Sequence, residues 1–82
     1  MTTRPYVYRI RVLSHLDKHW RRDPVVRMRH GRDTEKRAVT SLDIQVADQA
    51  ELVGVLGDLC GLGMQVTYLR LLRGSGGEQA AR

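Results

Sequence analysis

The chain has 82 residues, of which 41% are hydrophobic and 28% charged, a balance that indicates one globular domain and excludes a disordered chain. Its single cysteine excludes an internal disulfide and a metal cluster built from several cysteines. The net charge of +5 permits anionic partners such as nucleic acid. No apolar run approaches the roughly 20 residues that span a bilayer, so no membrane association and a cytoplasmic location are expected.

The first three predicted elements are strands, because apolar residues recur at every second position in three segments. These segments are residues 6–16, 25–30 and 37–46. A polar turn that ends in Asp23-Pro24, a pair that disfavours helix, joins the first two segments, and a charged hairpin loop joins the second to the third. Each strand is expected to have one buried and one solvated face.

One amphipathic helix is predicted at residues 48–63. Asp48 is a favourable N-cap residue, and Glu51 three positions later completes a capping-box pattern. Gly63 is expected to end the helix in a left-handed conformation, since glycine carries no Cβ penalty there. Apolar residues occupy about half of the helix circumference, a face suited to covering a sheet. They are Leu52, Val53, Val55, Leu56, Leu59, Cys60 and Leu62.

Residues 64–72 form the last predicted strand, with Val66 and Tyr68 on one side and Leu69 and Leu71 on the other. The β-β-β-α-β order predicts an α+β two-layer sandwich, in which one helix covers one face of a mostly antiparallel four-stranded sheet. Pairing of the first strand with the last gives the spatial order 3-2-1-4. The single domain is expected at residues 6–72, with disordered tails at residues 1–5 and 74–82.

Two stretches together resemble a known group of sequences. They read Tyr8-x-Ile10-Arg11-Val12-x-x-His15-Leu16-Asp17-x-x-Trp20 and Asp48-Gln49-Ala50-x-Leu52-x-Gly54-x-Leu56-x-x-Leu59-x-x-Leu62-Gly63. From Tyr8 to about Leu72 the chain is similar to an uncharacterised family of small stand-alone bacterial proteins. The resemblance implies a compact single-domain bacterial protein and no particular activity. The segment 21–37, which looks acidic in that family, is basic here.

The residues give no candidate catalytic, cofactor-binding or metal-binding site. His15 and His19 have the spacing of two zinc ligands on a helix, but they straddle a predicted strand end and no further ligands follow at recognisable spacing. Ser14, His15 and Asp17 diverge to opposite faces of a strand, which is a poor geometry for a Ser–His–Asp relay. A non-enzymatic protein without a cofactor is therefore expected.

The preferred functional hypothesis is association with itself or with another protein, as a homodimer or as a small subunit of a larger assembly. A stripe of small residues on the helix would let another backbone approach closely. Alternatively, the leucines of the last strand would form a sheet-based contact if they emerge on the open sheet face beside Leu13 and Val39. The candidate interaction residues are Gly54, Gly57, Gly61, Leu69 and Leu71.

The alternative hypothesis is a nucleic-acid-binding module. Arg9 and Arg11 of the first strand and Arg27 and Arg29 of the second share the parity opposite the helix, so the open sheet face would carry four guanidinium groups. RNA-binding sheets stack bases on aromatic residues of that face, whereas the tyrosines of the first strand fall on the helix-facing side. These arginines alternatively serve only to keep the open face solvated.

Overall fold

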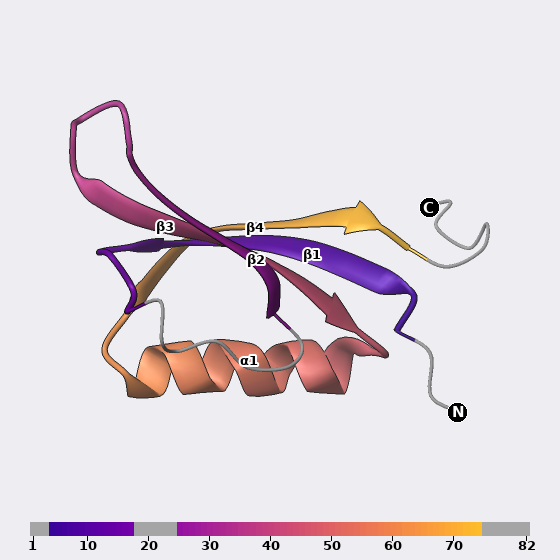
Figure 1. Ribbon diagram of the computed structural model, residues 1–82. Coiled ribbons are helices and arrows are strands. Elements are labelled where there is room, and N and C mark those ends of the chain that lie inside the picture. The colour runs from indigo at the N-terminus through magenta and orange to yellow at the C-terminus, as the bar shows by residue number, and fades with distance from the viewer. Residues whose placement is uncertain (1–3, 18–24, 75–82) are drawn as a thin grey trace.

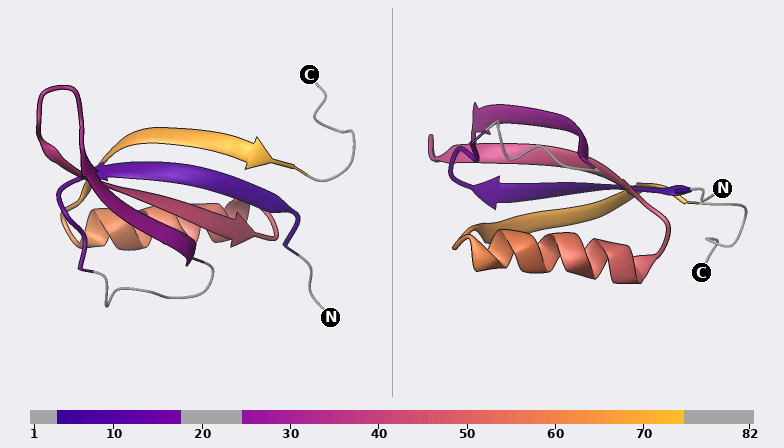
Figure 2. Two further views of the ribbon diagram at one scale, coloured as in Figure 1. Left: turned by 45° about the horizontal axis from the view of Figure 1, so that its top comes forward. Right: turned by 60° about the horizontal axis from the view of Figure 1, so that its bottom comes forward.

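The computed structural model of the protein describes residues 4–17 and 25–74 (Figure 1). These residues form the strands β1 (Tyr6–Leu13), β2 (Val25–Arg32) and β3 (Ala38–Val46), the helix α1 (Gln49–Gly61) and the strand β4 (Gln65–Arg73). The helix lies against one face of the sheet and leaves the other face open (Figure 2). The predicted α+β class and element order are confirmed. His19, Trp20 and the outer parts of both expected tails lie outside the described residues.

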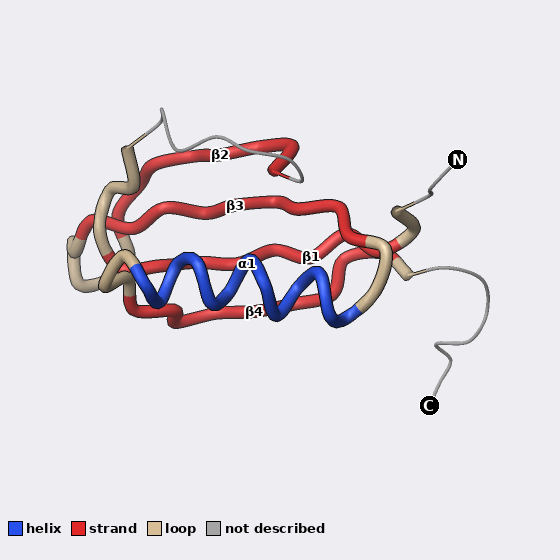
Figure 3. The backbone as a smooth tube through the Cα atoms, turned by 90° about the horizontal axis from the view of Figure 1, so that it is seen from below, coloured by secondary structure: helices blue, strands red, loops and turns tan. Residues whose placement is uncertain are grey.

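Every pair of neighbouring strands is antiparallel, and the sheet order is β2-β3-β1-β4 (Figure 3). The first strand pairs with the last, as expected, but this pair is antiparallel, whereas two hairpins followed by a crossover helix would have made it parallel. The second and third strands exchange places relative to the spatial order 3-2-1-4. Since β1 and β2 both run antiparallel to β3, they run parallel to each other, so the chain crosses back between them instead of forming a hairpin. The connection at residues 14–24 is close to the dozen residues that a crossover needs.

This order and these directions are those of the ferredoxin-like β-α-β-β-α-β arrangement, with α1 in the place of its second helix. Both connections between parallel strands skip one strand, so β1 and β3 become the central pair and β2 and β4 the edges. The arrangement hosts many functions and therefore carries no functional conclusion by itself.

The core lies between α1 and the side of the sheet that faces it. Alternate residues of the central strands, such as Ile10, Leu42 and Ile44, are fully buried there. The buried face of α1 is narrower than the apolar pattern predicted, because Val53, Cys60 and Leu62 remain exposed. The helix residues that pack into this core are Leu52, Val55 and Leu59, with Leu56 partly buried beside them.

Both predicted ends of the helix are confirmed. The Oδ1 atom of Asp48 accepts a hydrogen bond from the Glu51 amide at 3.0 Å, and Glu51 Oε1 accepts one from the Ala47 amide at 2.8 Å. At the other end Gly63 has a φ of +82°, and its amide donates to the Cys60 carbonyl while the Met64 amide donates to Leu59. This pair of bonds is a Schellman motif, and it turns the chain into β4.

The stretch that follows β1 is held by one buried hydroxyl. Thr40 of β3 is completely buried, and its Oγ1 accepts a hydrogen bond from the Leu16 amide and donates one to the Ser14 carbonyl, both at 2.8 Å. A ring nitrogen of His30 lies 2.7 Å from the Leu16 carbonyl oxygen. These contacts hold Leu16, itself buried, in the core and start the chain on its way from β1 to β2.

Thr40→Val should destabilise the protein by about 1–3 kcal/mol, because it removes the partner of a buried amide and of a carbonyl while keeping the side-chain volume. Thr40→Ser is the matched control, since it keeps both hydrogen bonds and loses one methyl group, worth about 0.8 kcal/mol. Urea denaturation followed by circular dichroism measures both. A Thr40→Val protein with the wild-type unfolding midpoint would contradict this role of the hydroxyl.

Candidate functional site

The open face of the sheet, on the side away from α1, carries two rows of mostly polar residues. Residues that lie opposite each other on neighbouring antiparallel strands share a face, so the strand register defines these rows. From β2 to β4, the first row is Arg27, Asp43, Arg9 and Arg70, and the second row is Arg29, Ser41, Arg11 and Tyr68.

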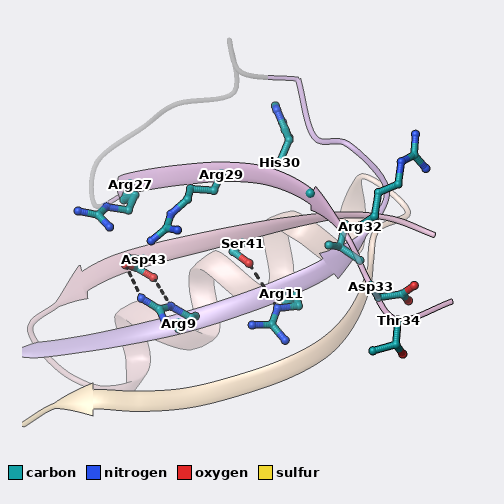
Figure 4. Close-up of a pocket in the computed structure, with 12 residues that line it drawn as sticks. Arg9, Arg11, Arg27, Arg29, His30, Arg32, Asp33, Thr34, Ser41 and Asp43 are labelled. Atoms are coloured by element: carbon teal, nitrogen blue, oxygen red, sulfur yellow. Dashed lines mark hydrogen bonds and ion pairs between the residues drawn. The ribbon is translucent and has the colours of Figure 1, made fainter. Parts of the chain in front are cut away.

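The structure thus brings the four predicted arginines to one face. They are not on adjacent strands, however, because β3 lies between β1 and β2 and inserts Asp43 and Ser41 between the two pairs (Figure 4). All four line an open cleft with a volume of about 590 Å³. The β2–β3 hairpin curves away from α1 in Figure 1 and adds Arg32, Asp33 and Thr34 to the lining of this cleft.

Asp43 is the carboxylate at the centre of the first row. The Nε atom of Arg9 donates to Asp43 Oδ1 at 2.8 Å and Nη2 donates to Oδ2 at 3.1 Å, a two-pronged ion pair. The hydrogen bond from Arg9 lowers the pKa of Asp43 from its usual value, and the positive charges of Arg9, Arg27 and Arg29 lower it further against the opposing effect of burial. Asp43 is therefore ionised at neutral pH and aligns the guanidinium of Arg9 along the sheet.

Arg11 is positioned by two neighbours in the second row. Its Nε atom donates to the Ser41 hydroxyl at 3.3 Å, and its guanidinium carbon lies 4.5 Å from the centre of the Tyr68 ring. The latter is a cation–π contact, which holds the guanidinium against the ring. Arg27 and Arg29, in contrast, are exposed, and no hydrogen bond or ion pair engages their side chains within residues 4–17 and 25–74.

Asp33 has its carboxylate occupied by the hairpin itself. Its Oδ1 accepts hydrogen bonds from the Glu35 and Arg37 amides, both at 2.8 Å, and its Oδ2 accepts one from Arg37 Nε at 2.8 Å. The backbone hydrogen bond from Arg37 is the main cause that lowers the pKa of Asp33. This carboxylate orders the wall of the cleft and has Arg37 as its counter-ion, so it neutralises none of the arginines of the two rows.

Tyr68 and Arg70 are the functional candidates that sequence reasoning missed. Strict alternation put Tyr68 on the same face as Val66, but the register between β1 and β4 shifts, so that Val12 lies opposite Val66 while Arg11 lies opposite Tyr68. The extra residue is Thr67, whose hydroxyl donates to the Arg11 carbonyl at 3.3 Å. The sequence held one indication of this bulge. Apolar residues occur at both odd- and even-numbered positions of this strand, and a bulge produces that pattern.

The same shift determines where Leu69 and Leu71 lie. They are opposite Ile10 and Tyr8, on the helix side of the sheet, and so do not join Leu13 and Val39 on the open face. Both remain exposed because β4 is an edge strand. Gly54, Gly57 and Gly61 are exposed on α1, and apart from the adjacent helix backbone no described atom lies within 4 Å of the position that a Cβ would take at any of them.

Residues 4–17 and 25–74 contain no group of three His, Cys, Asp or Glu side chains that could hold a metal ion. No helix in this part of the chain is long and apolar enough to cross a membrane. His15 and His30 have ring centres 5.0 Å apart, but a ring nitrogen of each lies within hydrogen-bonding distance of a backbone carbonyl oxygen, which gives both a structural role.

Comparison with protein families matches residues 7–70 to a model described as Domain of unknown function (DUF8691). The chain belongs to this family. The match runs from β1 into β4 and therefore includes the central strands, the helix and the rows of the open face up to Arg70. Searches of the curated proteins and of the solved structures find no match. The family agrees with the resemblance to an uncharacterised family and names no activity.

Asp43→Asn should lower the free energy of unfolding by about 1 kcal/mol at pH 7, because it replaces the ion pair to Arg9 with a neutral contact. The folded-state pKa lies below the unfolded value of about 3.9, so the stabilisation is present above that value and is lost as the pH falls through the folded pKa. Urea denaturation at pH 7 and in steps below pH 4 should show the difference from wild type closing.

In an Arg9→Gln background the effect of Asp43→Asn at pH 7 should shrink, since the donor of the ion pair is gone. An effect of Asp43→Asn that is the same at every pH, or the same with and without Arg9, would contradict the assignment.

Proposed function

We propose that this protein is a non-catalytic interaction module of the bacterial cytoplasm, whose open sheet face binds the phosphate backbone of nucleic acid. The observation that carries the proposal is the pair of rows across the sheet. They place Arg9, Arg11, Arg27, Arg29 and Arg70 on one face with Asp43 as the one carboxylate among them.

The spacing of these arginines suits an extended polyanion better than a single phosphate. Arg27 and Arg9 lie two strands apart, about 9–10 Å across the sheet, and the two rows are two residues apart, about 7 Å along the strands. The backbone positions that carry these side chains are thus spread over a surface. A polymer with regularly repeating phosphates can contact several of them at once and release counter-ions at each contact.

The side chains of the face favour contacts with phosphates over contacts with bases. On RNA-binding sheets of the four-stranded kind, aromatic residues stack on two or three bases. Here the described central strands carry arginine, serine and aspartate in the two rows, and the one aromatic ring, Tyr68, lies on the edge strand with Arg11 against it. Binding with little dependence on base sequence is therefore expected.

The same groups support a binding role without catalysis. A carboxylate whose pKa is lowered by an arginine is a weak proton acceptor, because a useful general base has a pKa near the working pH. The Ser41 hydroxyl accepts a hydrogen bond from Arg11, and within residues 4–17 and 25–74 no side-chain base hydrogen-bonds to it and could activate it. The cleft offers guanidinium groups, some held by neighbouring side chains and some exposed, and such groups bind anions.

Association with another protein, as a homodimer or as a subunit of a larger assembly, is the second candidate function. One observation favours it. The edge strand β4 leaves Leu69, Leu71 and Leu72 exposed to 46%, 42% and 39%. Exposed apolar residues on a free strand edge are a common means of contact between chains.

The affinity for a mixed-sequence single-stranded oligonucleotide of about 20 nucleotides, measured by fluorescence anisotropy, should fall steeply between about 50 and 200 mM salt. Replacing both Arg27 and Arg29 by Ala should weaken binding at least about tenfold and reduce the slope of log K against log salt by about 1.4, or about 0.7 for each phosphate no longer neutralised. These two side chains are chosen because they are exposed and support no internal hydrogen bond among the described residues.

The matched control compares two single substitutions. Arg27→Ala removes a charge from the open face, whereas Arg4→Ala removes one that lies beside Glu51 at the start of α1, with Arg4 Nη2 3.1 Å from Glu51 Oε2. Arg27→Ala should weaken binding and Arg4→Ala should have little effect. Equal losses from both would show that only net charge matters, and no binding of wild type at about 50 mM salt would refute the proposal.

A further inference from the structure

The outer edge of β4 has the properties of a pairing surface. It is one of the two edges of the sheet, and its nine residues contain no proline that would block a neighbouring strand. The other edge, β2, carries the charged and polar side chains Arg27, Arg29, His30 and Arg32, with Val26 as its exposed large apolar residue. The strand β4 also carries two arginines, Arg70 and Arg73, but it leaves three large apolar side chains exposed where β2 leaves one, so it is the more apolar edge.

The leucines of β4 make this edge apolar on the side that faces the helix layer. Leu69 lies opposite Ile10, and Leu71 lies opposite Tyr8, so both belong to the core face of the sheet. Yet Ile10 is fully buried, whereas the two leucines are nearly half exposed. Covering them would remove apolar surface from water, at about 25 cal/mol for each Å² buried.

The sequence of β4 is complementary to itself in one antiparallel register. If two copies pair about a twofold axis at Leu69, Leu69 faces its own counterpart and Tyr68 faces Arg70 of the other copy. In each molecule the first row ends at Arg70 and the second row ends at Tyr68. This pairing therefore joins the first row of each sheet to the second row of the other sheet. The ring of Tyr68 then has Arg11 of its own chain on one side and Arg70 of the second copy on the other.

Other registers are worse. A shift that moves the axis to Arg70 sets two arginines directly opposite each other, which is destabilising. A shift to Tyr68 sets Arg70 opposite the bulged stretch Val66–Thr67 of the second copy and separates the ring from the guanidinium. A slip by one residue would turn one sheet over, so that the leucines of one copy would lie on the same side of the joined sheet as the open face of the other copy. Among these registers, the one centred on Leu69 pairs this leucine with its own counterpart and a ring with a cation.

We propose that two copies of this chain pair through β4 in this register and join their sheets into one continuous antiparallel sheet. Both helices then lie on the same side, and the two open faces become one basic surface. The dimer itself does not depend on the nucleic-acid proposal. The consequence for binding does, because a joined surface contacts about twice as many phosphates of a long strand.

A disulfide cross-link tests the register. In a Cys60→Ser background, Leu69→Cys puts two thiols opposite each other, where a Cα separation of about 4.5–5.5 Å is within the range a disulfide accepts. Mild oxidation should yield a species of twice the 9.3 kDa chain mass on a non-reducing gel. The control is Leu71→Cys in the same background. Its counterpart lies four residues along the paired strand, about 13–14 Å away, and should not cross-link.

No cross-link at Leu69→Cys, or equal cross-linking at both positions, overturns the register. Analytical ultracentrifugation tests the dimer. Wild type at tens of micromolar should sediment as a dimer and Leu69→Glu as a monomer, with circular dichroism confirming that the variant is folded. Val26→Glu places the same charge on the other edge, at a side chain that is 51% exposed, and should leave the dimer intact. A monomeric wild type, or a dimeric Leu69→Glu protein, overturns the proposal.

The two proposals fail in different ways. If the joined surface binds nucleic acid, Leu69→Glu should retain binding but with about half the salt slope of wild type on a long single strand. An unchanged slope in a monomeric variant overturns the joined surface. Failure of the cross-linked dimer to bind any oligonucleotide at about 50 mM salt refutes the nucleic-acid function and leaves the dimer standing.

Discussion

The structure depends on burial of one side of β1 and β3 beneath α1. Ile10, Leu42 and Ile44 have no exposed surface, and they meet Leu52, Val55 and Leu59 of the helix. Because side chains alternate along a strand, this burial sends every intervening residue to the opposite face. The arginines of β1 and the aspartate and serine of β3 are therefore on the open face as a direct consequence of where the core lies. Loss of this packing would remove the fold and the candidate site together.

The chemistry of the open face follows from how few anions accompany its cations. Asp43 engages Arg9 with two hydrogen bonds, and Ser41 and Tyr68 engage Arg11, so the two arginines of the central strand are aligned before any ligand binds. Asp33 is committed to Arg37 and to the hairpin backbone. The exposed arginines of β2 are left to meet an external anion. Groups that are aligned before binding lose little freedom when a ligand binds.

The edge position of β4 relates the two proposals to each other. The register shift that brings Tyr68 to the open face also keeps the leucines on the helix side, where the adjoining layer leaves them half exposed. One irregularity in the pairing of β1 with β4 therefore produces both an aromatic partner for Arg11 and an apolar strip at the edge. Pairing of two such edges covers the strip and brings the rows of arginines into one surface.

Much of this organisation is determined by the sequence. Alternation of apolar residues marks the strands and assigns Arg9, Arg11, Arg27 and Arg29 to one face, and Asp48 and Gly63 mark the ends of the helix. These signals are local, since they depend on the period of the backbone and on capping groups a few residues apart. The α+β class and the β-β-β-α-β order follow from them.

The tertiary structure alone decided the position of β3 between β1 and β2, the pairing of Arg9 with Asp43, and the face on which Tyr68 lies. Each of these depends on contacts between residues far apart in the chain. The length of the connection between β1 and β2 is compatible with a crossover and with a hairpin; the structure has the crossover, and Thr40 and His30 hold the chain at Leu16 where it leaves β1. A bulge breaks the period of two on which strand faces are assigned, and its place in β4 is set by the pairing with β1.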